Sequence, residues 1–342
     1  MKLLVITQKI DKNDPVLGFF HTWVEELSKV SESVNVICLE KGEFSFDNNV
    51  KVYSLGKEGS VSRLAYLLNF YKHLYKLRGE YDSVFVHMNQ EYVLLGGLYW
   101  RLCGIPIYLW RNHPVGNFIT TLAVGFATKV FCTAPNSFTA SFKKTVIMPV
   151  GYDSKTIKST EGTVRKKYSI LMLGRVSPVK NIDLGVRAVD HLIKSGTQVS
   201  LSIVGSPPKR DINYYENLKK MVLDFGISNN VTFAGEVPKT KISEIFSGHE
   251  IFLNLTNSFD KTVVESVACG TMPIVSNLSL GNFLPEVCIT KDSPEEIAKS
   301  LQRLLNPTEQ VKIKKDLEYF VESQSLDALV RKLNIEMKQN GN

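Results

Sequence analysis

Short, continuously apolar runs alternate with segments of helical spacing along most of this chain. In the first half, the apolar runs are residues 3–6, 34–39, 84–86, 107–110, 130–132 and 146–148. A strand that is apolar at every position is typical of a parallel sheet that is buried on both faces. Segments of helical spacing lie between these runs, as at residues 19–30 and 61–77. The alternation predicts repeated strand–helix–strand units and a doubly wound α/β sheet.

The same alternation begins again after a polar stretch, residues 153–167, which holds five basic side chains and no long apolar run. Further strands are predicted at residues 169–173, 199–204, 231–234, 251–255, 272–275 and 287–289. A chain of 342 residues is long enough for two domains. We therefore predict two similar α/β domains, residues 1–152 and 168–324, joined by the polar stretch. Residues 325–342 have helical spacing and could cross back onto the first domain.

The composition excludes several other classes of protein. With 44% hydrophobic and 22% charged residues, the chain is globular rather than disordered. A formal charge of +7 favours anionic partners and leaves nucleic acid, a membrane surface and a nucleotide phosphate open. Residues 92–110 are strongly apolar, but Arg101 and four glycine and proline residues favour a helix, a turn and a buried strand over a membrane span. Five cysteines without Cys-x-x-Cys spacing predict a reduced, cytoplasmic protein.

The second domain opens with a glycine turn that places two cations after a buried strand. Gly174 and Arg175 follow residues 169–173, and Lys180 comes just before a helix that is predicted to begin near Ile182. The carboxyl ends of parallel strands are where α/β sheets bind ligands, and two cations there suit a diphosphate. By themselves the two cations are a weak signal, because most cations in loops are simply solvated.

A second stretch, residues 254–275, predicts a strand, a polar loop, a helix from about Thr262 that stops at Gly270, and another strand. The N-terminus of such a helix offers free N–H groups and a positive dipole end, which suit a phosphate. Glu265 is flanked by apolar Val264 and Val267, so its burial would require hydrogen-bond partners such as a pair of ribose hydroxyls. The helix dipole alone also explains an acid at this position.

Together these segments resemble the nucleotide-sugar domain of the retaining glycosyltransferases of family 4, the glycosyl transferases group 1, which have the GT-B fold. The matching segments are Gly174-Arg175 with Lys180, residues 265–275, 201–205, 231–238 and 149–153. The resemblance implies two Rossmann-like doubly wound domains that face a cleft, the first for the acceptor and the second for the nucleotide sugar. It also implies transfer of a hexose, with retention, from a UDP- or GDP-sugar to a glycan or lipid-linked saccharide, as in polysaccharide biosynthesis.

The resemblance further implies roles for single residues. Arg175 and Lys180 would neutralise the diphosphate that leaves as the sugar C1–O bond breaks, and Glu265 would hold the ribose. His113, which follows the strand at 107–110, would line the sugar site near the reacting carbon and act with these cations. The backbone amides of residues 261–263 would meet phosphate or sugar. The implied donor-binding residues are Gly18, Gly174, Val237, Asn257, Ser258, Phe259, Asp260, Lys261, Thr262, Val263 and Glu265. No cofactor is implied, and the absence of any Asp-x-Asp sequence agrees with a metal-independent site.

One position departs from the family. The paired-acid motif of the family has its first Glu eight positions before the second, where this chain has Asn257. Asn keeps hydrogen-bonding capacity but lacks the charge that would orient a hydroxyl of the donor sugar. Asp260 is the candidate to replace that carboxylate. Two alternatives stay open: a nucleotide-sugar epimerase of the same fold and, because of Asn257, a catalytically weakened nucleotide-sugar or glycan-binding protein.

Residues 61–78 combine four Lys and Arg residues with many aromatic side chains and no acid. Such a helix could lie on an anionic membrane surface, as suits a peripheral enzyme on the inner face of a membrane. A core helix with a basic solvent face explains the same pattern and is commoner. Residues 1–150 hold 16 basic and 12 acidic side chains, an even share of the excess charge that argues against a polarised surface. No motif predicts nucleic-acid binding.

Overall fold

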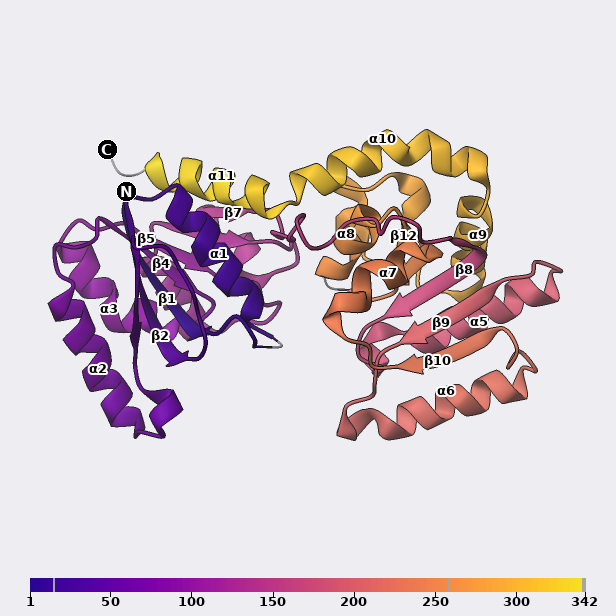
Figure 1. Ribbon diagram of the computed structural model, residues 1–342, viewed down its shortest axis with the longest axis horizontal. Helices are drawn as coiled ribbons and strands as arrows, with labels where there is room; N and C mark the ends of the chain where they lie inside the picture. Colours follow the sequence, from indigo (N-terminus) through magenta and orange to yellow (C-terminus); the bar gives the residue numbers. More distant parts are fainter. Residues whose placement is uncertain (15, 258, 340–342) are drawn as a thin grey trace. The chain divides into compact units, whose positions relative to one another are not determined.

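The computed structural model describes residues 1–14, 16–257 and 259–339. The chain divides into two compact units (Figure 1). Unit 1 comprises Met1–Gly151 and Leu326–Asn342, and unit 2 comprises Tyr152–Ser325. The chain therefore passes between the units twice, after Gly151 and again after Ser325.

Seven parallel strands form the sheet of unit 1, in the order β3-β2-β1-β4-β5-β6-β7. The strands are β1 Lys2–Ile10, β2 Ser33–Lys41, β3 Val50–Ser54, β4 Ser83–His87, β5 Ile107–Trp110, β6 Lys129–Cys132 and β7 Thr145–Ile147. β4 and β5 are buried at every position, which explains their continuously apolar sequences. The apolar runs do not reveal β3, because it lies at the edge of the sheet and is only partly buried. The strand order reverses between β1 and β4, and ligands of doubly wound sheets bind at such switch points.

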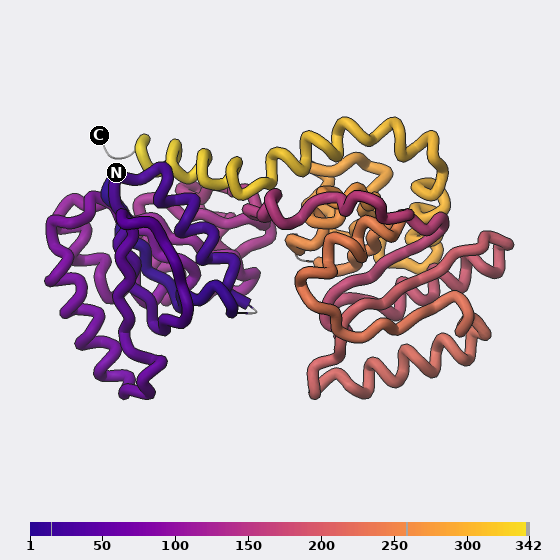
Figure 2. Tube along the Cα trace, in the orientation of Figure 1, coloured from indigo at the N-terminus to yellow at the C-terminus, as the bar shows by residue number. Residues whose placement is uncertain are grey.

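Helices cover both faces of this sheet (Figure 1). They are α1 Gly18–Lys29, α2 Arg63–Lys76, α3 Glu91–Leu102, α4 Phe118–Phe126 and α11 Leu326–Lys338. Trp23 of α1 and Leu329 and Leu333 of α11 belong to the core on one face, and Phe70 of α2 and Trp100 of α3 to the core on the other. The hydroxyl of Tyr108 donates a hydrogen bond to the carbonyl oxygen of Met337 at 2.6 Å. The last helix therefore packs on the first part of the chain, which the trace in Figure 2 also shows.

Five parallel strands form the sheet of unit 2, in the order β10-β9-β8-β11-β12, with a switch point between β8 and β11. The strands are β8 Lys166–Leu173, β9 Ser200–Val204, β10 Val231–Gly235, β11 His249–Asn254 and β12 Met272–Val275. The helices are α5 Ile182–Lys194, α6 Ile212–Asp224, α7 Ile242–Ser247, α8 Lys261–Ala268, α9 Pro294–Leu304 and α10 Pro307–Ser323.

Two features of unit 2 differ from the expectation. The predicted strand at residues 287–289 is wrong: Glu286–Cys288 form a 3-10 helix, and Ile289 makes only an isolated bridge to Val275. A short apolar run indicates only that the segment is buried. A buried turn and a buried strand both have such a sequence. The polar stretch 153–167 lies within unit 2, where the amide of Thr160 donates a hydrogen bond to Ser247 Oγ at 3.0 Å.

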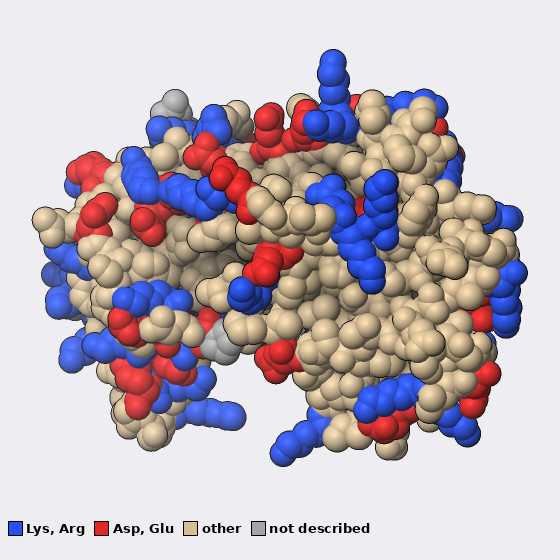
Figure 3. Space-filling model, turned by 45° about the vertical axis from the view of Figure 1, so that its right-hand side comes forward, with Lys and Arg blue, Asp and Glu red and all other residues tan. Residues whose placement is uncertain are grey.

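The most apolar stretch of the chain, residues 92–110, forms most of α3, a turn and β5, as its sequence predicts. Gly104 takes a φ of 69° in that turn. Within the described residues, no helix is both long enough and apolar enough to cross a membrane. On the face shown in Figure 3, basic and acidic side chains are interspersed.

Candidate functional site

Glycines allow the loops after β8, β9 and β10 to lie close together at the carboxyl edge of the unit 2 sheet. Gly174, Gly205 and Gly235 end or follow β8, β9 and β10, and each has a positive φ, of 135°, 134° and 70°. The amide of Gly174 donates to the carbonyl oxygen of Val204 at 2.9 Å, and that of Gly205 to Gly235 at 2.7 Å. A Cβ atom on Gly205 would lie 1.9 Å from the carbonyl oxygen of Gly174. The β8 loop therefore crosses the β9 loop with no room for a side chain between them.

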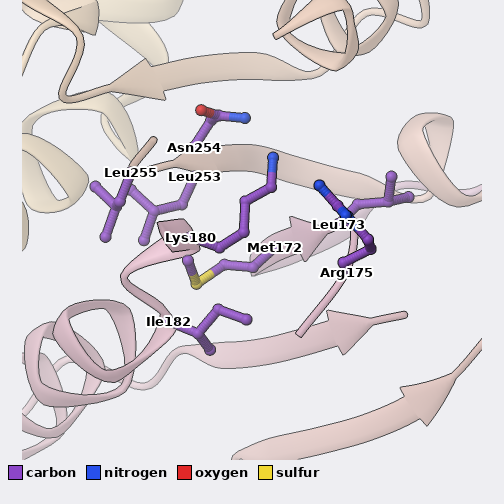
Figure 4. A pocket seen from close by; sticks show the side chains of 9 residues that line it. Met172, Leu173, Arg175, Lys180, Ile182, Leu253, Asn254 and Leu255 are labelled. Atoms are coloured by element: carbon purple, nitrogen blue, oxygen red, sulfur yellow. The ribbon is translucent and has the colours of Figure 1, made fainter. Parts of the chain in front are cut away.

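Arg175 and Lys180 lie on this β8 loop, beside the switch point of the sheet. Asn181, with a φ of 48°, turns the chain into α5, and its Nδ2 donates to the carbonyl oxygen of Leu255 at 2.9 Å, which ties the loop to the residue after β11. Both cations line one small pocket, shown in Figure 4, with room for about one water molecule (about 10 Å³). Its lining residues are Met172, Leu173, Gly174, Arg175, Lys180, Ile182, Leu253, Asn254 and Leu255. A ligand larger than a water molecule would therefore lie outside this pocket.

Asp260, the residue before α8, holds Lys180 in place. Lys180 Nζ lies 2.5 Å from Asp260 Oδ2, and the two side chains are 20% and 19% exposed. Asp260 Oδ1 accepts a hydrogen bond from the amide of Thr262 at 3.2 Å, so the same carboxylate caps α8. Burial favours the neutral acid, but the charge of Lys180 and the hydrogen bonds from Lys180 and Thr262 outweigh burial and lower the pKa of Asp260. The loops after β8 and β11 are thus joined by an ion pair.

Glu265 lies one turn further along α8 and is largely buried. Its side chain is 15% exposed, and Oε1 lies 3.5 Å from Nζ of Lys261, one helical turn earlier. Burial raises the pKa of Glu265, and the charge of Lys261 opposes that rise. A carboxylate with four lone-pair positions and one lysine nearby can accept further hydrogen bonds, which hydroxyl groups of a ligand would supply.

Two buried polar atoms near this edge make no hydrogen bond within the described residues: Ser276 Oγ and Asn277 Nδ2. Ser276 and Asn277 directly follow β12, and the amide of Ser276 donates to the carbonyl oxygen of Asn254 at 3.2 Å. Buried polar groups without partners are rare and destabilising. They indicate that this edge is arranged for a polar ligand. The motifs do not single out Ser276 and Asn277, whose signal in the sequence is a polar pair directly after a strand.

The other implied donor residues of unit 2 occupy varied environments. Val237 is half-buried in the loop after β10, and Asn257 is exposed after β11. Phe259 is buried and stacks on Phe283, with ring centroids 6.3 Å apart. The side chain of Val263 is in the core, and its amide donates to the carbonyl oxygen of Asp260 at 3.0 Å. Two of the amides expected to meet phosphate, those of Thr262 and Val263, therefore bond to Asp260 in this structure. Ser258 lies outside the described residues.

In unit 1, His113 lines a pocket of about 610 Å³ at the switch point of the sheet. Its lining residues are Gln8, Lys9, Asp14, Val16, Leu17, Glu40, Lys57, Met88, Asn89, Arg111, Asn112 and His113. His113 Nδ1 lies 2.8 Å from the carbonyl oxygen of Val115 and 3.0 Å from its amide nitrogen, and the tautomer of the ring decides which of the two hydrogen bonds forms. Gly18 begins α1 beside this pocket, and a Cβ atom there would lie 3.0 Å from the carbonyl oxygen of Lys12. The chain thus passes close to its own backbone at Gly18, which a side chain would hinder.

Charged groups of both signs are fixed in this unit 1 pocket. Lys9 Nζ lies 2.9 Å from carboxylate oxygens of both Asp14 and Glu40, and Lys57 Nζ lies 3.1 Å from Glu40. A hydrogen bond from the Leu17 amide, followed by one from Lys9, lowers the pKa of Asp14 to about 2. The pocket therefore offers many oriented hydrogen-bonding groups with little net charge, which suits a polyhydroxylated ligand.

Comparison with solved structures establishes the fold. Anabaena HepE in complex with UDP superposes with a TM-score of 0.76 at 15% identity, covering 99% of this chain and 100% of HepE. A glycosyltransferase from Rickettsia africae superposes with a TM-score of 0.72 at 13% identity, covering 99% and 98%. The chain has the GT-B fold, and the prediction of two Rossmann-like doubly wound domains is confirmed.

Sequence comparisons concern mainly unit 2. The family model described as "Glycosyl transferases group 1" matches residues 153–319. The phosphatidylinositol N-acetylglucosaminyltransferase GPI3 subunit of Saccharomyces cerevisiae is 27% identical over 144 residues, 40% of this chain and 30% of that protein. The D-inositol 3-phosphate glycosyltransferase of Acidothermus cellulolyticus is 27% identical over 151 residues, 40% of this chain and 33% of that protein. The alignments thus span about a third of the length of these curated relatives.

Proposed function

We propose that this protein is a glycosyltransferase that moves a hexose from a UDP- or GDP-sugar to an acceptor hydroxyl. The observation that carries the proposal is the carboxyl edge of unit 2, where Arg175 and Lys180 line one pocket beside the switch point and α8 carries the largely buried Glu265. Two cations, of which Asp260 holds Lys180 in place, suit a diphosphate, and a largely buried carboxylate suits a pair of ribose hydroxyls. The match of residues 153–319 to the group 1 model and the UDP complex of HepE support the proposal.

In the proposed reaction, the bond between the sugar C1 and the diphosphate oxygen breaks through an oxocarbenium-like transition state. The acceptor oxygen bonds to C1 on the same face, which gives retention, and its proton passes to the departing diphosphate oxygen. Arg175 and Lys180 stabilise the negative charge that develops on that oxygen. We assign this stabilisation to the two cations alone, without a metal or cofactor, and propose that His113 hydrogen-bonds a sugar hydroxyl.

For the acceptor, we propose a glycan or a lipid-linked saccharide. The pocket of unit 1 supports this assignment, because Lys9, Asp14 and Glu40 hold one another in fixed orientations that hydroxyl groups can engage. We therefore assign the donor to unit 2 and the acceptor to unit 1. A cytoplasmic location is also proposed, supported by five cysteines that are all free thiols.

A thermal-shift screen against UDP, GDP, ADP and their sugars tests the proposal. A ligand at a hundred times its Kd is expected to stabilise the protein by about 2.7 kcal/mol, which raises Tm by several degrees. Product analysis then distinguishes the proposed transferase from the two alternatives, an epimerase of the same fold and a binding protein without activity. A transferase forms product only with an acceptor, an epimerase converts the donor alone, and a binding protein does neither. No shift with any of the nucleotides would contradict all three.

The raised pKa of Glu265 predicts how donor affinity depends on pH. A carboxylate that accepts hydrogen bonds from ribose loses them when it is protonated, so affinity is expected to fall roughly tenfold or more as the pH is lowered. Because burial raises the pKa of Glu265, the fall begins above 4.5, the ordinary value, whereas the lowered pKa of Asp260 places its titration below 3.8. The same shift means that any stabilisation of the fold by protonated Glu265 is lost as the pH rises through its pKa.

Isothermal titration calorimetry with the nucleotide selected by the screen measures this dependence. Glu265→Gln is the matched control, because it keeps the shape of the side chain and removes the titration. It is expected to bind more weakly at neutral pH and to show no change over the same range. A Glu265→Gln variant with the wild-type pH profile would remove Glu265 from the donor site.

A further inference from the structure

Basic residues are segregated within unit 1. Residues 59–152 hold nine Lys and Arg and three Asp and Glu, whereas residues 1–58 hold seven and nine. Although the excess charge is shared evenly between the two halves of the chain, residues 59–152 alone have an excess of six positive charges. This stretch contains α2, α3 and α4, which cover one face of the unit 1 sheet.

The outward surface of these three helices carries many large apolar side chains. α3 buries Tyr92, Val93 and Trp100 and also exposes large apolar side chains, among them Leu98 at 62% and Leu102 at 80%. α4 contains no charged residue and exposes Phe118 at 79%. We call this surface the α2–α4 face. Its exposed apolar residues are Leu64, Leu68, Tyr71 and Tyr75 of α2, Leu95, Leu98, Tyr99 and Leu102 of α3, and Phe118, Ile119 and Leu122 of α4.

The three helices are packed together, so these side chains form one surface. The hydroxyl of Tyr71 in α2 donates to the carbonyl oxygen of Leu95 in α3 at 3.1 Å, and α3 packs along α4. A helix that is apolar on all sides is normally covered, and a large exposed apolar surface marks a binding site for a protein or a membrane. Among the described residues, no other helix exposes more than two large apolar side chains, as at Ile212 and Leu223 of α6, whereas α2 and α3 expose four each and α4 three.

The charges of the α2–α4 face have nearly one sign. Arg63, Lys72 and Lys76 lie on α2 and Arg101 on α3, and all four are exposed. None of these cations makes an ion pair within the described part of the chain, although Lys76 Nζ lies over the ring of Tyr53, 5.3 Å from its centre. Glu91, at the start of α3, is the one acid in the three helices.

We propose that the α2–α4 face docks on an anionic lipid bilayer. Its leucine, isoleucine and aromatic side chains enter the interfacial region, and the exposed cations contact the anionic headgroups. A second copy of the same face would oppose like cations with a single acid per subunit, so charge disfavours a symmetric dimer through this face. The inference goes beyond the proposed function and does not depend on donor binding. It also extends the basic helix indicated by the sequence to a surface of three helices.

Flotation of the full-length chain with lipid vesicles tests the proposal. The protein is expected to float with phosphatidylcholine vesicles that contain 30% phosphatidylglycerol and not with pure phosphatidylcholine, and added salt weakens binding. Leu98→Glu/Leu102→Glu places charge at the centre of the face and is expected to abolish flotation. Lys72→Gln/Lys76→Gln is expected to lower the affinity roughly 25-fold, about fivefold for each lysine near an anionic surface.

Matched controls carry the same substitutions on unit 2. Ile212→Glu/Leu223→Glu changes two exposed apolar residues of α6, and Lys220→Gln/Lys315→Gln changes two exposed lysines of α6 and α10. Both are expected to float like the wild type. Circular dichroism melting verifies that every variant is folded, and the nucleotide thermal shift, measured without vesicles, reports the donor site separately.

Three outcomes would overturn the proposal. The first is equal flotation with neutral and anionic vesicles, and the second is wild-type flotation of Leu98→Glu/Leu102→Glu. The third is a wild-type dimer in sedimentation velocity that this variant dissociates, with no flotation of the wild type, which would assign the face to a second copy of the chain.

Discussion

Lys180→Ala is expected to lower kcat/KM roughly a hundredfold, and Arg175→Ala roughly tenfold or more. Each substitution removes a charge-assisted contact to the diphosphate whose charge grows in the transition state. Lys180→Ala has the larger effect because it also leaves the carboxylate of Asp260, 19% exposed, without the cation that lies 2.5 Å away. That uncompensated negative charge would face the incoming diphosphate. Initial rates with the donor selected by the thermal-shift screen measure both effects.

The double variant Lys180→Ala/Asp260→Asn separates the two contributions to this loss. It removes the repulsive carboxylate while Asn continues to cap α8 at the amide of Thr262. Its kcat/KM is expected to recover roughly fivefold or more over Lys180→Ala. No recovery would mean that Asp260 has a role of its own toward the donor, as expected if it replaces the carboxylate that Asn257 lacks.

Lys194→Ala is the matched control, because it breaks an ion pair of the same kind elsewhere. Lys194 Nζ lies 2.7 Å from Asp190 at the end of α5 remote from the β8 loop, and the side chain of Asp190 is 8% exposed. This variant is expected to lose stability and to retain wild-type kcat/KM. Near-wild-type turnover in both Lys180→Ala and Arg175→Ala would contradict the assignment of the leaving-group site.

The sequence predicts the cations of the site because their signal is local. Gly174 and Arg175 directly follow an apolar run, and in a parallel sheet the residue after a strand lies at the ligand-binding edge. The ion pair between Lys180 and Asp260 joins residues 80 positions apart, and no local pattern encodes such a contact. The sequence therefore presents Asp260 as a candidate carboxylate for the sugar, whereas the structure shows it as the partner of Lys180.

The sequence misleads where a segment is buried but does not pair with a neighbouring strand. Most strands of the two sheets could be predicted because strands buried on both faces must be apolar throughout, whereas β3, at the edge of its sheet, is only partly buried and could not. Residues 287–289 satisfy the same pattern, yet two turn hydrogen bonds, from Cys288 to Pro285 and from Ile289 to Glu286, make them a 3-10 helix. The sequence does not single out Ser276 and Asn277, because two polar residues after a strand are usually exposed. Their polar atoms without hydrogen bonds are recognisable only once the structure shows that these residues are buried.

Gly205→Ala is expected to destabilise unit 2 and to abolish donor binding. A Cβ atom would lie 1.9 Å from the carbonyl oxygen of Gly174, and the φ of 134° is unfavourable for any residue with a side chain. Strain and overpacking together are expected to cost about 2 to 6 kcal/mol, a fall in Tm of roughly 5 to 20 °C. Relief of the clash would displace the β8 loop and move Arg175 from the sheet edge.

Gly226→Ala separates this clash from backbone strain. Gly226 also lies in unit 2 with a positive φ, 71°, but a Cβ atom there would have no atom within 4 Å beyond its neighbours in the chain. The substitution is therefore expected to cost only about 1 kcal/mol and to leave the nucleotide thermal shift unchanged. Calorimetric melting with and without nucleotide compares the two variants. Equal melting temperatures for Gly205→Ala and Gly226→Ala would show that the β8 loop can move away from the new Cβ atom with no loss of stability. The close crossing of the β8 and β9 loops would then not be what orients Arg175.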